Sequence, residues 1–162
     1  MLTRTDAIKT DDIGVFLRLL MPANRLAVET ALQTGLRVSD VLSLRSDKLR
    51  QRMTVREQKT GKRRRVYISA DLFHRLQRQA GSVYVFPNTL DPFRHRCRQT
   101  VWKDVKRAAK ALRVDYNVGP HSCRKSYAVD LYRREGFAAV QKALQHDNPA
   151  TTMIYLASAV LS

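Results

Sequence analysis

The sequence has 162 residues, the length of one ordinary domain, and a hydrophobic fraction of 44%, which is too high for a disordered chain. Its 30 Lys and Arg residues against 14 Asp and Glu residues give a formal net charge of +16 and indicate a polyanionic partner, nucleic acid first of all. The alternatives are a ribosome-like structural protein and an unusually basic solvated surface. Because Met1–Thr10 carry no apolar run and no stretch approaches the ~20 residues of a membrane span, we expect no membrane partner and a protein of the cytoplasm or nucleoid.

The first part of the sequence predicts three helices. Thr10 is expected to cap a helix that runs to Leu20. Pro22 begins a second helix, and Gly35 is placed to end it. A short third helix is predicted over Ser39–Leu44.

The pattern then changes to the alternation of β-strands. Apolar residues alternate with polar ones at Met53 and Val55, and again at Val66 and Ile68. Between the two runs lies Lys59-Thr60-Gly61-Lys62, which predicts a β-hairpin with Gly61 in its turn.

The segment after the hairpin predicts one helix and one more strand. Ser69 caps the helix, which ends near Gly81. Val83–Phe86 is predicted as a third strand, and Pro87 stops it.

The remainder of the sequence predicts helices alone, with a break at Gly119-Pro120. The helices run from Asp91-Pro92 to about Arg113, from about His121 to Arg134, from Phe137 to Leu144, and from Asn148-Pro149 through Tyr155. The predicted fold is therefore mainly α with a small antiparallel β-sheet, within a single domain spanning residues 1–162.

The two cysteines do not have the spacing of metal ligands. Cys97 and Cys123 both fall in predicted helices and read as reduced thiols. We expect no metal and no other cofactor.

Basic residues gather in two places. One group surrounds the hairpin and includes Lys62, Arg63, Arg64 and Arg65. The other follows the long predicted helix, where spacings of three and four residues place Lys103, Lys106, Arg107 and Lys110 on one face with Asp104 as the only acid nearby. We interpret both groups as DNA-phosphate contacts, because an ordinary solvated face mixes charges of both signs.

Three short segments carry residues able to bind or attack a phosphate. Arg37 follows a helix end, and Asp40 lies where its carboxylate can orient the guanidinium by a bidentate pair. His121 and Arg124 share one helix face near an anion-friendly N-terminus. Tyr155 lies on the short helix that follows His146. Each segment alone also fits a surface pair or a packing residue.

The ordered set is more specific than its parts. It consists of Arg37 with Asp40, Lys59 in a Lys-Thr-Gly hairpin, His121 with Arg124, His146, and Tyr155. In identity, order and spacing it resembles the catalytic set of the tyrosine recombinase (phage integrase) family, over essentially the whole chain. The local sequence also matches at Thr34-Gly35-Leu36-Arg37, Lys59-Thr60-Gly61 and Thr151-Thr152-Met153-Ile154-Tyr155.

The resemblance implies phosphoryl transfer to an amino-acid side chain. Tyr155 would attack a DNA phosphodiester, form a 3′-phosphotyrosyl link and release a 5′-hydroxyl, with no metal and no ATP. Arg37 and Arg124 would clamp the non-bridging oxygens. His121 would accept the tyrosine proton or hydrogen-bond the phosphate, and His146 would donate to a non-bridging oxygen.

The remaining roles follow from the same resemblance. Lys59 would protonate the leaving 5′-oxygen, with Lys62 as the second candidate for this general acid. Asp40 would support the pocket from behind. Three positions depart from the family pattern. The family usually has Glu where this chain has Asp40, Leu where it has Cys123, and Gly where it has Gln145. Without that Gly, the turn before His146 should be less tight.

Two other functions are compatible with this pattern. A type IB topoisomerase shares the chemistry, and a non-catalytic DNA-binding remnant of a mobile element would share the charge. The family's separate N-terminal core-binding domain is expected to be absent from this chain. The expected partner is double-stranded DNA, on which further recombinase subunits would assemble, and we expect a monomer without DNA.

Overall fold

The computed structural model describes residues 5–119 and 121–160, and within them the chain is mainly helical with one small sheet. In chain order the elements are α1 (Thr10–Leu19), α2 (Pro22–Thr34), α3 (Val38–Leu42), η1 (Ser46–Lys48, a 3₁₀-helix), β1 (Arg52–Arg56), β2 (Arg63–Tyr67), α4 (Ala70–Gln79), α5 (Arg98–Leu112), α6 (Ser122–Glu135), α7 (Phe137–Leu144) and α8 (Pro149–Val160). The predicted fold class is confirmed. Within the described residues, no helix is both long and apolar enough to cross a membrane.

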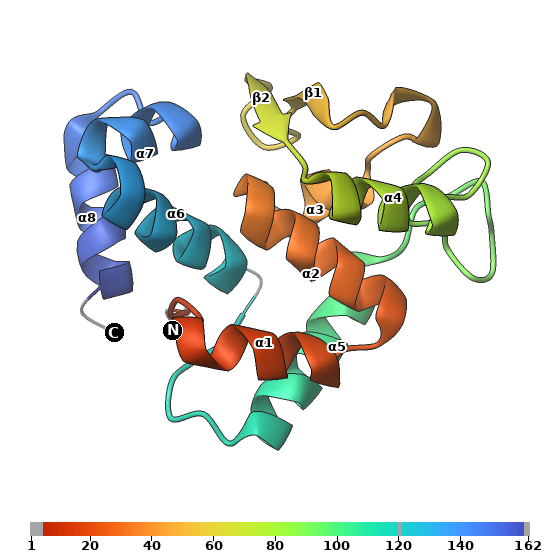
Figure 1. Cartoon of the computed structure of the whole chain (residues 1–162), viewed down its shortest axis with the longest axis horizontal. Coiled ribbons are helices and arrows are strands. Elements are labelled where there is room, and N and C mark those ends of the chain that lie inside the picture. The colour runs from red at the N-terminus through yellow and green to blue at the C-terminus, as the bar shows by residue number, and fades with distance from the viewer. Residues whose placement is uncertain (1–4, 120, 161–162) are drawn as a thin grey trace.

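Helix α2 is the centre of the arrangement. In Figure 1 it runs between α6 and α4, with β1 and β2 above it and with α1 and α5 below. Its buried side, which includes Ala27, Val28 and Ala31, belongs to the larger hydrophobic cluster. That cluster extends to Ile68 after the hairpin and to Val101 on α5, so α2 connects the sheet to the long helix.

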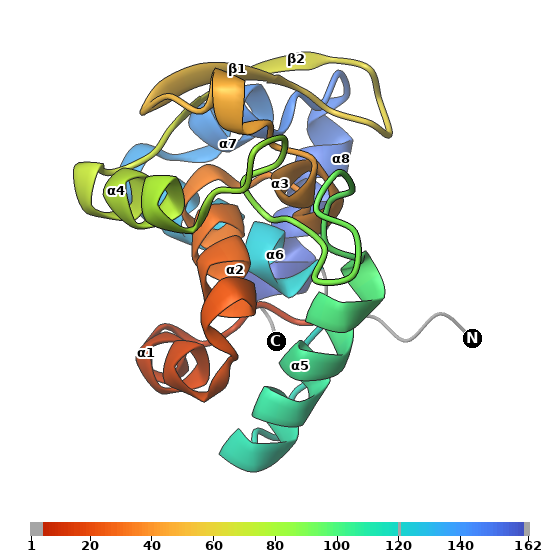
Figure 2. The ribbon, with the colours of Figure 1, turned by 90° about the vertical axis from the view of Figure 1, so that its right-hand side faces the viewer.

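The last three helices pack around a second, smaller cluster. Ala128 and Leu131 of α6 contact Val140 and Leu144 of α7 and Leu156 of α8, and Tyr155 packs against this cluster. Figure 2 shows α8 behind α6, on the side to which the hairpin turn also extends. Tyr155 is therefore carried by a packed three-helix unit.

The hairpin forms as predicted, with β1 antiparallel to β2 and Gly61 in the turn at φ +67°. Its register runs from Arg52 opposite Tyr67 to Arg56 opposite Arg63. Because side chains alternate along a strand, Val55 and Val66 point into the core while their neighbours point outward.

Two predicted elements are wrong. Val83–Phe86 does not form a strand, since only Tyr84 makes an isolated bridge, to Arg45, while Val85 and Phe86 are buried as single residues. The long helix begins at Arg98 and not at Pro92. The intervening segment instead folds back on itself, with an isolated bridge between Pro87 and His95, so Cys97 precedes α5.

The break expected at Gly119-Pro120 is only partly visible, because Pro120 lies outside the described residues. Helix α6 begins at Ser122 with His121 at its N-cap. The last helix is longer than the short one predicted, since α8 continues from Pro149 to Val160.

Candidate active site

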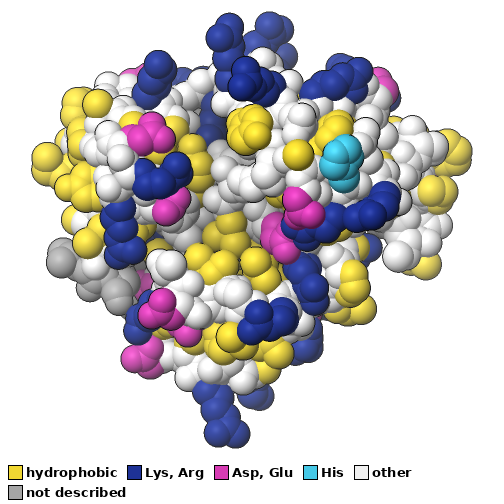
Figure 3. Space-filling view, viewed as in Figure 1, with side chains coloured by type: hydrophobic (Ala, Val, Ile, Leu, Met, Phe, Trp, Pro, Cys, Tyr) yellow, Lys and Arg dark blue, Asp and Glu magenta, His cyan; other side chains and the backbone are white. Residues whose placement is uncertain are grey.

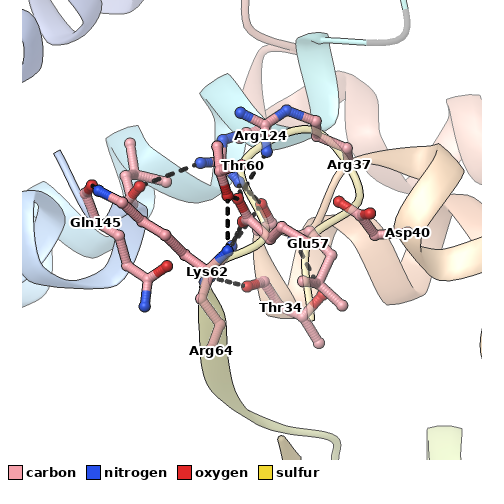
Figure 4. Close-up of polar contacts among 12 residues, drawn as sticks. Thr34, Arg37, Asp40, Glu57, Thr60, Lys62, Arg64, Arg124 and Gln145 are labelled. Carbon is pink, nitrogen blue, oxygen red and sulfur yellow. Dashed lines mark hydrogen bonds and ion pairs between the residues drawn. The ribbon is translucent and has the colours of Figure 1, made fainter. Parts of the chain in front are cut away.

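A buried carboxylate, that of Glu57, lies at the centre of the site (Figure 4). Arg37 donates to its Oε2 at 2.8 Å, and Arg124 and Arg64 donate to its Oε1 at 3.2 and 3.3 Å. The Thr60 hydroxyl also donates to Oε2, at 3.1 Å. Three guanidiniums from α6, β2 and the segment before α3 thus share one acid.

The end of α2 supplies the second support for these arginines. The Gly35 carbonyl accepts from Arg124 at 2.9 Å and from Arg64 at 3.2 Å, and the Thr34 carbonyl accepts from Arg64 at 2.7 Å. Arg124 also donates to the Leu144 carbonyl at 3.3 Å. Orphan carbonyls at two helix ends therefore hold the guanidiniums in place.

Electrostatics fix the charge of the central acid. Burial alone would raise the pKa of Glu57, but the charges and hydrogen bonds of Arg124, Arg37 and Arg64 outweigh it and lower the pKa to about 2. Glu57 is ionised at neutral pH, and the guanidiniums keep an excess of positive charge for a further anion.

Asp40 does not make the contact with Arg37 that its position suggested. It forms no ion pair with Arg37 among the described residues; its Oδ1 accepts the Gln58 N–H at 2.9 Å, and its Oδ2 is buried without a hydrogen-bond partner. Burial raises the pKa of Asp40. The predicted bidentate pair with Arg37 is wrong: Asp40 holds the hairpin backbone, and Glu57 pairs with the arginine.

Tyr155 presents a phenol without a partner. Its hydroxyl is buried and has no hydrogen-bond partner in the described structure. Burial raises the pKa of Tyr155 to about 12, although the nearby charges of Arg124 and Arg37 act in the opposite direction. The hydroxyl therefore lies within the field of the two arginines and leaves its hydrogen bond open to a ligand.

The two histidines lie beside this group and are held as neutral bases. The ring of His146 packs edge-on against Tyr155, with centroids 5.8 Å apart, and its Nδ1 lies 2.9 Å from the Thr152 hydroxyl. Desolvation and the charges of Arg124 and Arg37 lower the pKa of His146. Desolvation and the charges of Arg37 and Lys59 lower that of His121.

The two hairpin lysines are in different situations. Lys59 is exposed, with its charge close enough to influence His121. Lys62 donates to the Gln145 carbonyl at 3.0 Å and to the Asp147 carboxylate at 2.8 Å. The Lys62 ammonium therefore ties the hairpin to the segment that carries His146, whereas nothing described holds the Lys59 side chain.

The turn before His146 is as tight as a glycine would make it. Gln145 has φ +56°, in the left-handed region, and the His146 N–H donates to the Gln141 carbonyl across the helix end. The side-chain Nε2 of Gln145 donates to the Arg63 carbonyl at 2.6 Å. The expected looser turn is wrong, because the side chain gains an anchor on the hairpin that a glycine would lack.

The residues predicted to contact DNA divide into exposed and buried ones. Arg63 and Arg65 are exposed, but Arg64 is buried beneath the site, which corrects its expected place on the DNA-facing surface. The four residues of α5 that were predicted to contact DNA are all exposed: Lys103, Lys106, Arg107 and Lys110.

Two of these α5 residues already have intramolecular partners. Lys106 donates to the Asn117 side chain and lies 4.7 Å from the Trp102 ring centroid. Arg107 pairs with Asp104 at 2.6 Å.

The structure thus gathers Arg37, Arg124, His121, His146 and Tyr155 in one site. Sequence reasoning missed Glu57 and Arg64 as members of the site. Strand alternation would have found them, because Glu57 has the parity of Val55 and Arg64 has that of Val66. A polar residue on the inward face of a strand needs a buried partner.

The arrangement suits an anionic substrate attacked by an oxygen. Always-charged guanidiniums and neutral imidazoles surround an unpartnered phenol, so an incoming phosphate would find donors and a nucleophile together. Of the two thiols, Cys97 is exposed and Cys123 is buried, and burial raises the pKa of Cys123 to about 12. In the part of the chain that the structure describes, no group of three His, Cys, Asp or Glu side chains is placed to hold a metal.

Comparison with known proteins gives matches along almost the whole chain. The model of the phage integrase family matches residues 12–161. The tyrosine recombinase XerD of Lacticaseibacillus casei is 31% identical over 144 residues, which are 82% of this chain and 49% of that protein. The chain spans about half the length of the curated relatives that it matches first.

Solved structures share the fold. The catalytic domain of bacteriophage HP1 integrase superposes with a TM-score of 0.69 at 21% identity, covering 96% of this chain and 89% of that one. A lambda integrase dimer bound to a COC′ core site gives a TM-score of 0.76 at 21% identity, covering 96% of this chain and 49% of that one.

Proposed function

Since the chain belongs to the phage integrase family, we propose that it cuts and rejoins DNA strands through Tyr155 in site-specific recombination. The observation that carries this proposal is the buried, unpartnered hydroxyl of Tyr155 beside the charges of Arg37 and Arg124. A hydroxyl that only packs in a core normally finds a hydrogen-bond partner, because leaving one unmade destabilises the fold.

The proposed reaction exchanges one phosphoester bond for another. The Tyr155 oxygen attacks the scissile phosphorus as the P–O bond to the 5′-oxygen breaks, and its proton passes to His121. The product is a 3′-phosphotyrosyl link and a free 5′-hydroxyl, so a later attack by a 5′-hydroxyl restores a phosphodiester without ATP and without a metal step.

Each neighbouring side chain has a task in this step. Arg37 and Arg124 hold the non-bridging oxygens, where negative charge grows in the transition state. His146 donates to one of them. Lys59 protonates the leaving 5′-oxygen; we prefer it to Lys62, because the Lys62 ammonium is engaged by Asp147.

The partner that we propose is double-stranded DNA, with further recombinase subunits joining on the DNA and a monomer in its absence. Solved relatives in this fold are described as bound to DNA, among them the lambda integrase dimer on its core site. Backbone phosphates would be contacted by Lys62, Arg63, Arg65, Lys103, Lys106, Arg107 and Lys110. With DNA as substrate, we place the protein in the cytoplasm on the nucleoid.

Covalent capture on nicked suicide duplexes tests this function. Because the target site is unknown, the duplexes are drawn as a pool from the flanks of the source element. The native chain and Tyr132→Phe, which alters an exposed tyrosine of α6, should both leave a protein–DNA adduct on a denaturing gel. Tyr155→Phe should bind the same DNA and leave none.

Two results would overturn the proposal. An adduct that persists in Tyr155→Phe would remove Tyr155 as nucleophile, and DNA binding without any adduct would favour a non-catalytic remnant. If an adduct forms, joining of the captured strand to a second duplex separates a recombinase from a topoisomerase that only relaxes supercoils.

A further inference from the structure

The outward face of the hairpin carries a set of exposed side chains that the catalytic site does not use. This face consists of Arg52, Thr54, Arg56, Arg63, Arg65 and Tyr67, all of them exposed. No acid occurs among them, and Figure 3 shows Lys and Arg side chains crowding the upper edge of the molecule, where Figure 1 places β1 and β2.

The cross-strand register makes this face unfavourable in isolation. Arg56 lies directly opposite Arg63, and like charges in such a pair destabilise a hairpin. Some exposed arginines elsewhere on the described surface have acidic neighbours, as Arg45 has Asp47 and Arg134 has Asp130. None of the four arginines on the outward face has an ion pair among the described residues, so this face lacks a counter-charge that an anionic partner would supply.

The face is also hollowed. A shallow depression of about 680 Å³ is lined by Arg52, Met53, Thr54, Arg65, Val66 and Tyr67. The Arg52 guanidinium lies 5.9 Å from the centroid of the Tyr67 ring, which holds it over the depression. Guanidiniums at the border of a concave surface suit a backbone of repeating phosphates.

The sheet itself separates this face from the candidate active site. Glu57 and Arg64, which belong to that site, are buried on the inward side, while their strand neighbours Arg56, Arg63 and Arg65 point the other way. Duplex DNA is stiff over about 150 base pairs. A duplex with its phosphate at Tyr155 would have to bend sharply around the hairpin to reach the opposite face.

We therefore propose that the outward face of β1 and β2 binds the phosphate backbone of a second DNA duplex while the first lies over Tyr155. This rests on the proposed strand exchange, which requires two duplexes, but bridging of duplexes can be measured without cleavage. The face would hold the second duplex by charge and shape, since arginine–phosphate contacts carry no sequence information.

A bridging experiment tests this proposal with the full chain. One duplex is tethered to beads, a second carries a fluorophore, and retention of the second by the protein is measured. Arg52→Ala with Arg56→Ala, two arginines of this face that are not among the proposed contacts to the first duplex, should reduce retention about tenfold. Arg78→Ala with Arg133→Ala, which removes two exposed arginines elsewhere, should not.

Two further measurements fix the interpretation. Arg52→Lys with Arg56→Lys should restore most of the bridging, because the charge returns. The adduct on a suicide duplex should be unchanged in all these variants. Bridging equal to that of the control pair would overturn the proposal. So would an equal loss of affinity for a single duplex, since the face would then hold a flank of the first. A missing adduct with bridging intact would instead refute the proposed catalysis alone.

Discussion

At the scale of single residues, Glu57 determines how Arg37 and Arg124 are oriented. It contacts Arg37 through one oxygen and Arg124 through the other, so one buried carboxylate fixes the separation of the two guanidiniums. Preorganised donors of this kind do not have to reorient when charge develops on a phosphate. Glu57 is a positioning residue, because it acts through the arginines and not on the substrate.

Replacing this carboxylate should destabilise the fold. Glu57→Gln keeps the shape but leaves three buried or half-buried guanidiniums without a counter-charge, a loss of about 3–5 kcal/mol in the free energy of unfolding. Urea denaturation at pH 7 measures this. Glu135→Gln, at an exposed glutamate with a single long ion pair, should change the free energy little, and equal losses in both variants would contradict the role of Glu57.

The difference in stability between the native chain and Glu57→Gln should depend on pH. The pKa of Glu57 is lowered from 4.5 to about 2 in the folded state, so its contribution is fully present above pH 4.5 and is lost as the pH falls towards 2. The stability difference between the native chain and Glu57→Gln should therefore shrink across this window. A difference that stays constant from pH 7 to pH 2 would show that the carboxylate is not the group responsible.

Catalysis should show a second pH dependence. Because positive neighbours and desolvation lower the pKa of His121 below 6.5, this imidazole stays neutral, and able to accept the Tyr155 proton, to a lower pH than an ordinary histidine. The rate of adduct formation should fall only below pH 6.5, and His121→Gln should lack this acid limb. An acid limb at or above pH 6.5 in the native chain would contradict the assignment.

At the scale of elements, the C-terminal end of α2 supports the arginines of the site. Gly35 has φ +69°, its carbonyl receives two arginines, and a Cβ there would lie 2.4 Å from the Tyr127 ring. Gly61 has nearly the same φ, +67°, but its nearest neighbour would be the end of the Arg56 side chain at 3.8 Å. Substitution at Gly61 would therefore introduce backbone strain alone, whereas substitution at Gly35 would add steric overlap with Tyr127.

Alanine substitution should expose this difference. Gly61→Ala should lower the free energy of unfolding by about 1–2 kcal/mol, the left-handed backbone penalty alone. Gly35→Ala should lose about 1–3 kcal/mol more, because Tyr127 must move or the helix end must shift. Thermal unfolding of both variants checks this, and equal losses would show that the Tyr127 contact yields without strain.

Sequence periodicity predicted most elements because each helix and strand carried its own local signal. Pro22 and Gly35 delimit α2, and alternation marks the hairpin. The failed elements depended on distant partners: Val83–Phe86 has strand composition but too little neighbouring backbone to pair with, and Pro92 is a good first helical residue that the loop closed by Pro87 and His95 excludes. Strand alternation marks Glu57 as inward-facing, but it could not show that Glu57 binds Arg37 and Arg124, which are distant in sequence.

At the scale of the whole molecule, α5 buries its one acid and exposes its basic residues. Asp104 is the acid within the basic part of α5, and it is buried, accepting the Met21 N–H at 2.8 Å and the Asn24 amide at 2.9 Å. It thereby fixes α5 to the start of α2 and partly neutralises Arg107, while Lys103 and Lys110 have no ion pair among the described residues. The outer side of α5 is left basic, at the end of the molecule opposite the hairpin (Figure 1).

This distribution predicts the salt dependence of binding to a single duplex. Each lysine that neutralises a phosphate adds about 0.9 to the slope of log affinity against log salt, so Lys103→Ala with Lys110→Ala should reduce that slope by about 2. The measurement is a fluorescence titration of Tyr155→Phe with duplex DNA at several salt concentrations, which keeps cleavage out of the signal. Lys48→Ala with Lys142→Ala, two exposed lysines on other elements, is the control and should leave the slope unchanged. If the slopes of the two double variants are equal, the first duplex does not lie along α5, and its phosphates are held near the candidate active site alone.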